Sequence, residues 1–193
     1  MNILELKQRV AEFEEQISVE YDKDAEEECR EFIEGLESEG YALPPLYKAM
    51  LLELGGLEFE EPLWLGPATS QDHTPEELAL LHKSAELLSH SFQMEHGSGV
   101  AELGALNSLP IHGGDWWFDE IPRHYIHLGW FDGQAEPDSD IALLINAQPG
   151  DPRFGYIYAL DMCEGWDSFE DILVDTSFTS FCKRLMLPQY DDE

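Results

Sequence analysis

The sequence predicts an α+β fold: N-terminal helices, then a central, largely antiparallel sheet, then a C-terminal helix. In the first third of the chain, and again near residue 80, apolar residues recur every three or four positions, which is the helical period. Three later segments are β-branched, aromatic and apolar and are separated by turn-rich stretches, which is typical of strands. Helices, strands and a last helix in this order indicate an α+β domain.

The size and composition of the chain agree with one folded domain. It has 193 residues, 43% of them hydrophobic, with 5 Trp and 10 Phe to fill a core. We expect a single domain over residues 1–193, with roughly the first 40 residues as an acidic helical arm and an insertion around residues 74–121.

Two amphipathic helices are expected first, on either side of a polar break. Their apolar stripes are Ile3, Leu6, Val10, Phe13 and Ile17 in one helix and Cys29, Phe32, Ile33 and Leu36 in the other. Between Glu5 and Glu39 acidic residues far outnumber basic ones, so the outer faces of both helices should be strongly negative. An ordinary solvated surface is the simpler interpretation of that charge.

The stretch LPPLYKAMLLELGG, from Leu43 to Gly56, predicts a third helix with clear start and stop signals. Pro44 and Pro45 have the fixed φ that suits a first helical turn. Gly55 and Gly56 permit the left-handed backbone that often ends a helix. The stretch carries no catalytic side chain, so its role should be structural.

A strand and a fourth helix are expected next. LEFEEPLWLGP alternates apolar and acidic residues up to Pro62, which favours a short strand or sheet edge. Thr74, Pro75 and Glu77 form the pattern of a capping box at a helix start. The buried stripe of this helix is predicted to be Leu78, Leu81, Ala85, Leu88 and Phe92.

The second half of the chain predicts mainly loops up to residue 117, with one short element at most, followed by three antiparallel strands and a helix. The strands are HYIHLGWF, DIALLINA and FGYIYALDM, and turn-rich stretches separate them. DTSFTSFCKRLML should be the closing helix, with Lys183 and Arg184 near its C-terminal end. Its apolar side is predicted to be Phe178, Phe181, Cys182 and Leu185.

The net charge restricts the classes of partner. With 41 Asp and Glu against 10 Lys and Arg, the formal charge is −31, which argues against binding nucleic acid or anionic membranes and favours a basic partner. Acidity that serves only solubility is the alternative. Cys29, Cys163 and Cys182 lack paired spacing, no apolar run approaches the ~18 residues of a membrane span, and no secretory leader is recognisable, so we expect a cytoplasmic protein with free thiols.

No motif predicts catalysis, a cofactor or a metal site. His124 and His127 are three residues apart in an expected strand and would face opposite sides, and no histidine pair has a common ligand spacing. Ser98 lies between glycines but outside a nucleophile-elbow pattern, and no phosphate loop or dinucleotide fingerprint occurs. We therefore expect no catalytic residues and no cofactor.

Tryptophans beside carboxylates are the feature that most favours protein binding. Aromatic anchors surrounded by charge suit an interface with a basic partner, although most of these rings could instead fill the core, as we expect for Trp64 and Trp130. The candidate partner-binding residues are Trp116, Trp117, Asp119, Glu120, Asp132, Glu136, Asp138 and Asp140.

The motifs together resemble the Smi1/Knr4 superfamily, also called SUKH. LPPLYKAMLLELGG is similar to its leucine-proline helix that ends in glycines, HYIHLGWFDG, DIALLINA and GYIYALDM to its strands, and DTSFTSFCKRL to its closing helix. The residues that carry the resemblance at its two ends are Leu43, Pro44, Tyr47, Gly55, Gly56, Ser177, Phe178 and Phe181.

The resemblance implies a non-catalytic role. Bacterial members of the superfamily are similar to immunity proteins that neutralise toxins, often nucleases, by direct binding, and fungal members act as regulatory scaffolds in cell-wall signalling. We expect the first role, because an acidic protein can compete with nucleic acid for the basic cleft of a nuclease. A scaffold linked to cell-wall assembly is the second reading, and an enzyme with an unrecognised site is the third.

Overall fold

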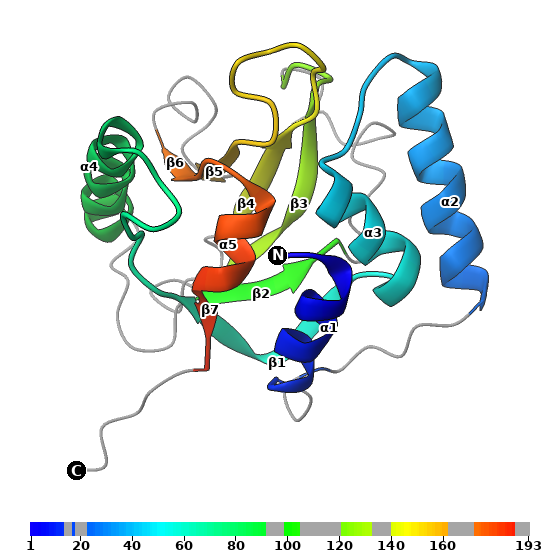
Figure 1. Ribbon diagram of the computed structural model, residues 1–193, viewed down its shortest axis with the longest axis horizontal. Helices are drawn as coiled ribbons and strands as arrows, with labels where there is room; N and C mark the ends of the chain where they lie inside the picture. The colour runs from blue at the N-terminus through cyan, green and yellow to red at the C-terminus, as the bar shows by residue number, and fades with distance from the viewer. Residues whose placement is uncertain are drawn as a thin grey trace.

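The computed structural model describes residues 1–13, 17, 23–91, 99–104, 121–132, 140–161 and 172–187 of the chain. Within them the fold is α+β, as predicted, with a curled antiparallel sheet of order β6-β5-β4-β3-β2-β1-β7 (Figure 1). The helices are α1 Ile3–Ala11, α2 Lys23–Ser38, α3 Pro45–Leu54, α4 Pro75–Ser91 and α5 Phe178–Arg184. The strands are β1 Leu57–Leu65, β2 Gly99–Leu103, β3 Tyr125–Asp132, β4 Asp140–Asn146, β5 Ile157–Asp161, β6 Leu173–Asp175 and β7 Leu185–Met186.

Helices cover both faces of the sheet, and β4 shows this most clearly. Ile141, Leu143 and Ile145 belong to the larger core cluster, to which α1, α2, α3 and α5 contribute. The alternate residues Ala142 and Leu144 belong to a smaller cluster that includes Leu81 of α4. Successive residues of a strand point to opposite faces, so both faces of β4 are buried and its apolar run has no polar alternation. In Figure 1, α4 accordingly lies apart from α1, α2 and α3.

The third helix has the predicted boundaries. It begins at Pro45 and ends at Gly55, whose φ of 67° is left-handed, and Gly56 follows with φ 104°. Tyr47 and Met50 of this helix are fully buried in the larger core cluster. A side chain at Gly104, after β2, would press into the same helix, because a Cβ there would lie 2.7 Å from Cδ2 of Leu51.

The predicted capping box of α4 is confirmed, but part of its predicted stripe is wrong. The Thr74 backbone N–H donates to Glu77 Oε2 at 2.7 Å, and the Glu77 N–H donates to the Thr74 hydroxyl at 3.3 Å. Ala85, expected inside, is exposed, whereas Ser84 is 2% exposed. The reason is that α4 packs on the edge of the sheet, where the Ser84 hydroxyl accepts the N–H of Leu173 in β6 at 3.0 Å.

The three predicted strands are confirmed as β3, β4 and β5, and the differences lie at the ends of the sheet. The short strands β6 and β7 were not expected, and the closing helix stops at Arg184, so that Leu185 is buried from β7 rather than from the helix. Strand β1 is not an edge strand, because β2 and β7 flank it, and Pro62 falls where its register with β2 shifts. Proline has no backbone N–H to donate to the neighbouring strand, and a bulge is a place in a sheet where that loss is tolerated.

At each edge strand of the sheet, a side chain from a helix bonds a backbone group. At β6 the partner is Ser84, and at β7 a guanidinium nitrogen of Arg9 in α1 donates to the carbonyl of Leu185. Short, covered edges prevent the sheet from pairing with another chain. The polar contact of Arg9 joins α1 to the sheet, and Leu6, Phe13, Cys29 and Ile33 join the N-terminal part of the chain to the core by apolar packing.

We expect Gly104→Ala to lower the free energy of unfolding by about 1–3 kcal/mol, because φ is +62° there and the new methyl group meets the buried Leu51. The matched control is Gly35→Ala on the exposed side of α2, where a Cβ meets nothing within 4 Å. It should raise the stability by about 0.5–1 kcal/mol, since alanine favours a helix. Urea unfolding of both variants measures the difference, and equal stabilities would contradict the close approach at Gly104.

Candidate functional site

The structure locates two of the eight candidate partner-binding residues. Trp116, Trp117, Asp119, Glu120, Glu136 and Asp138 lie outside the described residues. The other two, Asp132 and Asp140, end β3 and begin β4, and the backbone register places them directly opposite each other. In β5, Asp161 lies opposite Ile141, so a third acidic residue falls at the same end of the sheet.

Like charges directly opposed across an antiparallel pair destabilise a sheet. The pairing of Asp132 with Asp140 therefore costs stability unless a positive charge comes near. Between Asp115 and Asp175 the only Lys or Arg residues in the sequence are Arg123 and Arg153. Arg123 lies 4.0 Å from Glu39 and Arg153 lies 3.9 Å from Asp151, so each already has a carboxylate partner.

The outer side of α2 is a second acidic surface. Glu27, Glu31 and Glu34 are exposed, while Cys29 and Ile33 face the core. Within the described part of the chain, no ion pair involves these three glutamates, and the one arginine of α2, Arg30, is paired with Glu26 at 2.7 Å. The last turn of α2 has no basic residue to oppose the helix dipole.

Most of the positive charge on the described surface is paired locally. The basic side chains that lie within 4.0 Å of a carboxylate are Lys7, Arg9, Arg30, Lys48, Arg123, Arg153, Lys183 and Arg184. These pairs add no positive region on which a polyanion could bind. At α2 the exposed carboxylates of Glu27, Glu31 and Glu34 remain in excess.

The residues that carry the family resemblance form a structural contact. Tyr47 of α3 packs on Phe178 of α5 with ring centroids 5.0 Å apart, and Phe178 stacks on Phe181 at 6.3 Å. The Ser177 hydroxyl caps α5 by accepting the Ser180 N–H at 3.1 Å. Leu43 is buried beside them in the same core cluster. The two ends of the chain's motif pattern thus meet in the interior, where they hold α3 against α5 and offer no chemistry to solvent.

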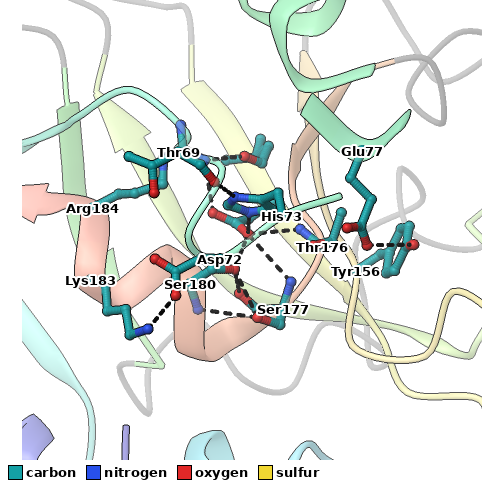
Figure 2. Close-up of polar contacts among 12 residues, drawn as sticks. Thr69, Asp72, His73, Glu77, Tyr156, Thr176, Ser177, Ser180, Lys183 and Arg184 are labelled. Atoms are coloured by element: carbon teal, nitrogen blue, oxygen red, sulfur yellow. Dashed lines mark hydrogen bonds and ion pairs between the residues drawn. The ribbon is translucent and has the colours of Figure 1, made fainter. Parts of the chain in front are cut away.

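A buried polar cluster that the sequence did not predict joins His73, Ser180 and Arg184, which are labelled in Figure 2, through the carboxylate of Asp175. The Asp175 carboxylate has 0% exposure, lies 3.0 Å from His73 Nε2 through Oδ1 and accepts from Arg184 through Oδ2 at 2.7 Å. The Thr176 N–H at 2.8 Å and the Ser180 hydroxyl also donate to Oδ1. A buried carboxylate is tolerated because these donors replace its water.

The cluster contains a serine, a histidine and an aspartate, but they are not arranged to activate a nucleophile. In such a site the histidine contacts the nucleophile and the carboxylate orients the histidine. Here the contacts of Ser180 and His73 both go to Asp175 Oδ1, so the carboxylate stands between them. Ser180 is also 3% exposed. The cluster therefore joins elements of the fold; it does not present a reactive hydroxyl.

In the described part of the chain, the two cysteines and the other groups with shifted pKa values give no sign of nucleophilic chemistry. Burial, followed by the charge of Glu28, raises the pKa of Cys29 to about 11, and burial raises the pKa of Cys182 as well. Such thiols stay protonated and unreactive at neutral pH. The Thr74 backbone N–H lowers the pKa of Glu77, whereas burial and then Glu77 raise the pKa of Tyr156, whose hydroxyl donates to Glu77 at 3.4 Å (Figure 2).

Among the described residues, no group of three or more His, Cys, Asp or Glu side chains is placed to hold a metal ion. None of the described helices combines the length and the apolar character that crossing a membrane requires.

In comparisons with protein-family models, curated proteins and solved structures, nothing matches this chain. The resemblance to the Smi1/Knr4 superfamily therefore stays a prediction, carried by the motifs themselves.

We expect Asp175→Asn to lower the free energy of unfolding by about 3–5 kcal/mol, because it leaves Arg184 without its buried counter-charge. Asp72→Asn removes a carboxylate from Lys183 at the surface, and should cost about 0–1 kcal/mol. Chemical denaturation of both variants measures the difference. Equal losses would mean that the Asp175 cluster contributes no more than a surface ion pair.

Proposed function

We propose that the chain is a non-catalytic protein-binding domain, an immunity protein that neutralises a basic, nuclease-type bacterial toxin by direct binding. The observation that carries the proposal is the opposition of Asp132 and Asp140 across β3 and β4, within a chain of net charge −31. A fold keeps a repulsive cross-strand pair at little cost only where something compensates it. A basic partner would supply that compensation.

The physical mechanism is competition for a basic cleft. A nuclease must hold a polyanion, so its active site is lined by Lys and Arg. An acidic protein is drawn to such a cleft over long range, and steering of this kind raises association rates by roughly 10 to 1000-fold at low salt. An aromatic anchor such as Trp116 or Trp117 would then slow dissociation by burying apolar surface.

The acidic side of α2 is the alternative contact face for the same partner. Glu27 and Glu31 are four residues apart and Glu31 and Glu34 three apart, spacings at which like charges on a helix repel. We favour the β3–β4 end, because two further candidate carboxylates, Glu136 and Asp138, lie in the sequence between Asp132 and Asp140. Reversing the charges of one face at a time distinguishes the two candidate contact faces.

For the test, the partner is the product of the gene next to the one that encodes this chain, co-expressed and purified with it. We expect the triple change Asp132→Lys, Asp138→Lys and Asp140→Lys to slow association at least tenfold and to flatten its dependence on salt. Stopped-flow or biosensor kinetics at two salt concentrations measure both effects.

The matched control changes the same number of charges on α2, as Glu27→Lys, Glu31→Lys and Glu34→Lys. It should slow association less, because it changes the net charge by the same amount but leaves the proposed contact face at the β3–β4 end intact. A larger effect from the α2 set would move the contact face to that helix. An association rate that is the same at low and high salt would overturn steering, and a neighbouring gene product without toxicity would favour the scaffold role.

A separate prediction concerns the stability of α2. Glu31→Gln should raise the free energy of unfolding by about 0.2–0.5 kcal/mol at low salt, because it removes repulsion from Glu27 and Glu34. The gain should disappear in high salt, where exposed charges are screened. Thermal unfolding at both salt concentrations is the measurement, and a loss of stability would mean that Glu31 has a stabilising partner.

A further inference from the structure

We propose that the sheet face opposite the larger core cluster is, at its β1 end, a docking surface for an arginine-bearing segment of a partner protein. The residues of this surface, which we call the β1 face, are Glu58, Glu60 and Trp64 of β1 and Trp130 of β3. The β1 face is independent of the proposed function, because it requires neither a toxin as partner nor a contact at the β3–β4 end.

In the described part of the chain, helix α4 covers the other end of the same face. Its Leu81 packs in the smaller core cluster, and its Ser84 hydroxyl accepts the N–H of Leu173 in β6, so the helix lies beside that edge strand (Figure 1). Strands β3, β4, β5 and β6 contribute to the smaller cluster. Strands β1 and β2 follow at the opposite end of the sheet order and add no described residue to it. The part of the face that they form therefore lies outside the cluster that α4 covers.

Strand β1 directs three side chains to this face by simple alternation. Its fully buried residues, which belong to the larger core cluster, are Leu57, Phe59 and Leu63. Successive residues of a strand point to opposite faces, so the residues that alternate with these point away from that cluster. Glu58 and Glu60 are accordingly exposed, and Trp64 is partly exposed.

A bulge in β3 brings Trp130 to the same face. Leu128 belongs to the larger core cluster, so strict alternation would place Trp130 there too. The register with β4 shifts between His127 and Gly129, and one extra residue reverses the alternation. Phe131 then enters the larger cluster, while Trp130 packs against the smaller cluster and stays partly exposed.

Strand β2 connects the two sides of the β1 face. Its register with β3 shifts between Val100 and Glu102, which places Glu102 directly opposite Trp130. On its other side Glu102 lies opposite Glu58 of β1. Neighbouring strands are about 4.8 Å apart, so this row of two acidic positions and an indole spans about 10 Å.

Arginine is the side chain that best matches exposed indoles beside carboxylates. A planar guanidinium stacks on an indole and pairs with a carboxylate through two parallel hydrogen bonds, whereas the ammonium of lysine is a point charge without a plane to stack. The Trp130 ring is already packed by His127, with ring centroids 4.7 Å apart. Little side-chain freedom is then lost on binding.

A second copy of this chain does not fit the β1 face. Each of its arginines already lies within 4.0 Å of a carboxylate of the same chain; these are Arg9, Arg30, Arg123, Arg153 and Arg184. Two copies that each carry a formal charge of −31 also repel. The occupant is therefore a segment of a different, basic protein.

The first experiment follows the two tryptophans directly. The whole chain is labelled with 5-fluorotryptophan and titrated with a peptide of repeated Arg-Ala-Ser units, and fluorine NMR resonances are assigned with Trp64→Phe and Trp130→Phe. We expect both resonances to shift, and the same peptide with lysine in place of arginine to bind about two- to fivefold more weakly. Unshifted resonances, or equal affinities for the two peptides, overturn the proposal.

The second experiment locates the contact with charge variants. Glu58→Lys together with Glu60→Lys should weaken binding of the arginine peptide about tenfold or more, because two attractions become repulsions. The matched control, Glu31→Lys with Glu34→Lys, makes the same change of net charge on the exposed side of α2. At about 0.15 M salt, where distant charges are screened, it should weaken binding less than about threefold.

Trp130→Phe tests the surface without changing its charge. It keeps an aromatic ring against the smaller cluster, and it should weaken the arginine peptide about two- to threefold, since phenylalanine attracts a cation less than tryptophan does. Equal losses in the two charge variants, or an unchanged affinity in Trp130→Phe, would mean diffuse attraction to an acidic chain instead of a docking surface. The probe is not the neighbouring gene product, so that result would not count against the proposed function.

Discussion

The buried carboxylate of Asp175 is the interaction on which the arrangement of the outer elements depends. It ends an edge strand of three residues, yet it contacts His73 from the segment before α4 and Ser180 and Arg184 from α5. Removing a charge from water is costly, and the cost is recovered only when all its donors are in place. The carboxylate therefore fixes three parts of the chain relative to one another, although His73 and Asp175 are 102 residues apart.

The scarcity of cations makes the placement of each one informative. Arg184 serves Asp175, the Val174 carbonyl and the Gly66 carbonyl, and Arg9 reaches the Leu185 carbonyl of the terminal strand. Guanidinium groups can satisfy several acceptors at once from a fixed plane. Arg184 thus joins β6, at one edge of the sheet, to the residue that follows β1, and Arg9 joins α1 to β7 at the other edge. Both arginines donate to backbone carbonyls within the fold, so their positive charges do little to offset the acidic surface.

Sequence reasoning succeeded where the signal is local. Gly55 ends α3, Thr74 and Glu77 cap α4, and apolar segments between turns become β3, β4 and β5. It failed where the position of a residue depends on a partner distant in the sequence. Ser84 is buried because its hydroxyl accepts an N–H of β6, and the helical period of α4 does not predict that contact. The Asp175 cluster was missed for the same reason. Of the candidate binding face, only Asp132 and Asp140 are located, and their opposition depends on strand register.

Charge repulsion and binding are linked in a chain of this composition. Repulsion between the neighbouring glutamates of α2, and between the aspartates opposed in the register of β3 and β4, should weaken the fold most at low salt, where charges are least screened. A basic partner would relieve the same repulsion, and anything that binds only the folded state also stabilises it. Salt should then act in opposite directions on the two equilibria: it strengthens the free fold by screening repulsion and weakens the complex by screening attraction. If the acidity serves only solubility, salt should strengthen the free fold and there is no complex for it to weaken. Measuring how salt changes both the stability and the binding affinity therefore distinguishes the two roles of the acidic surface.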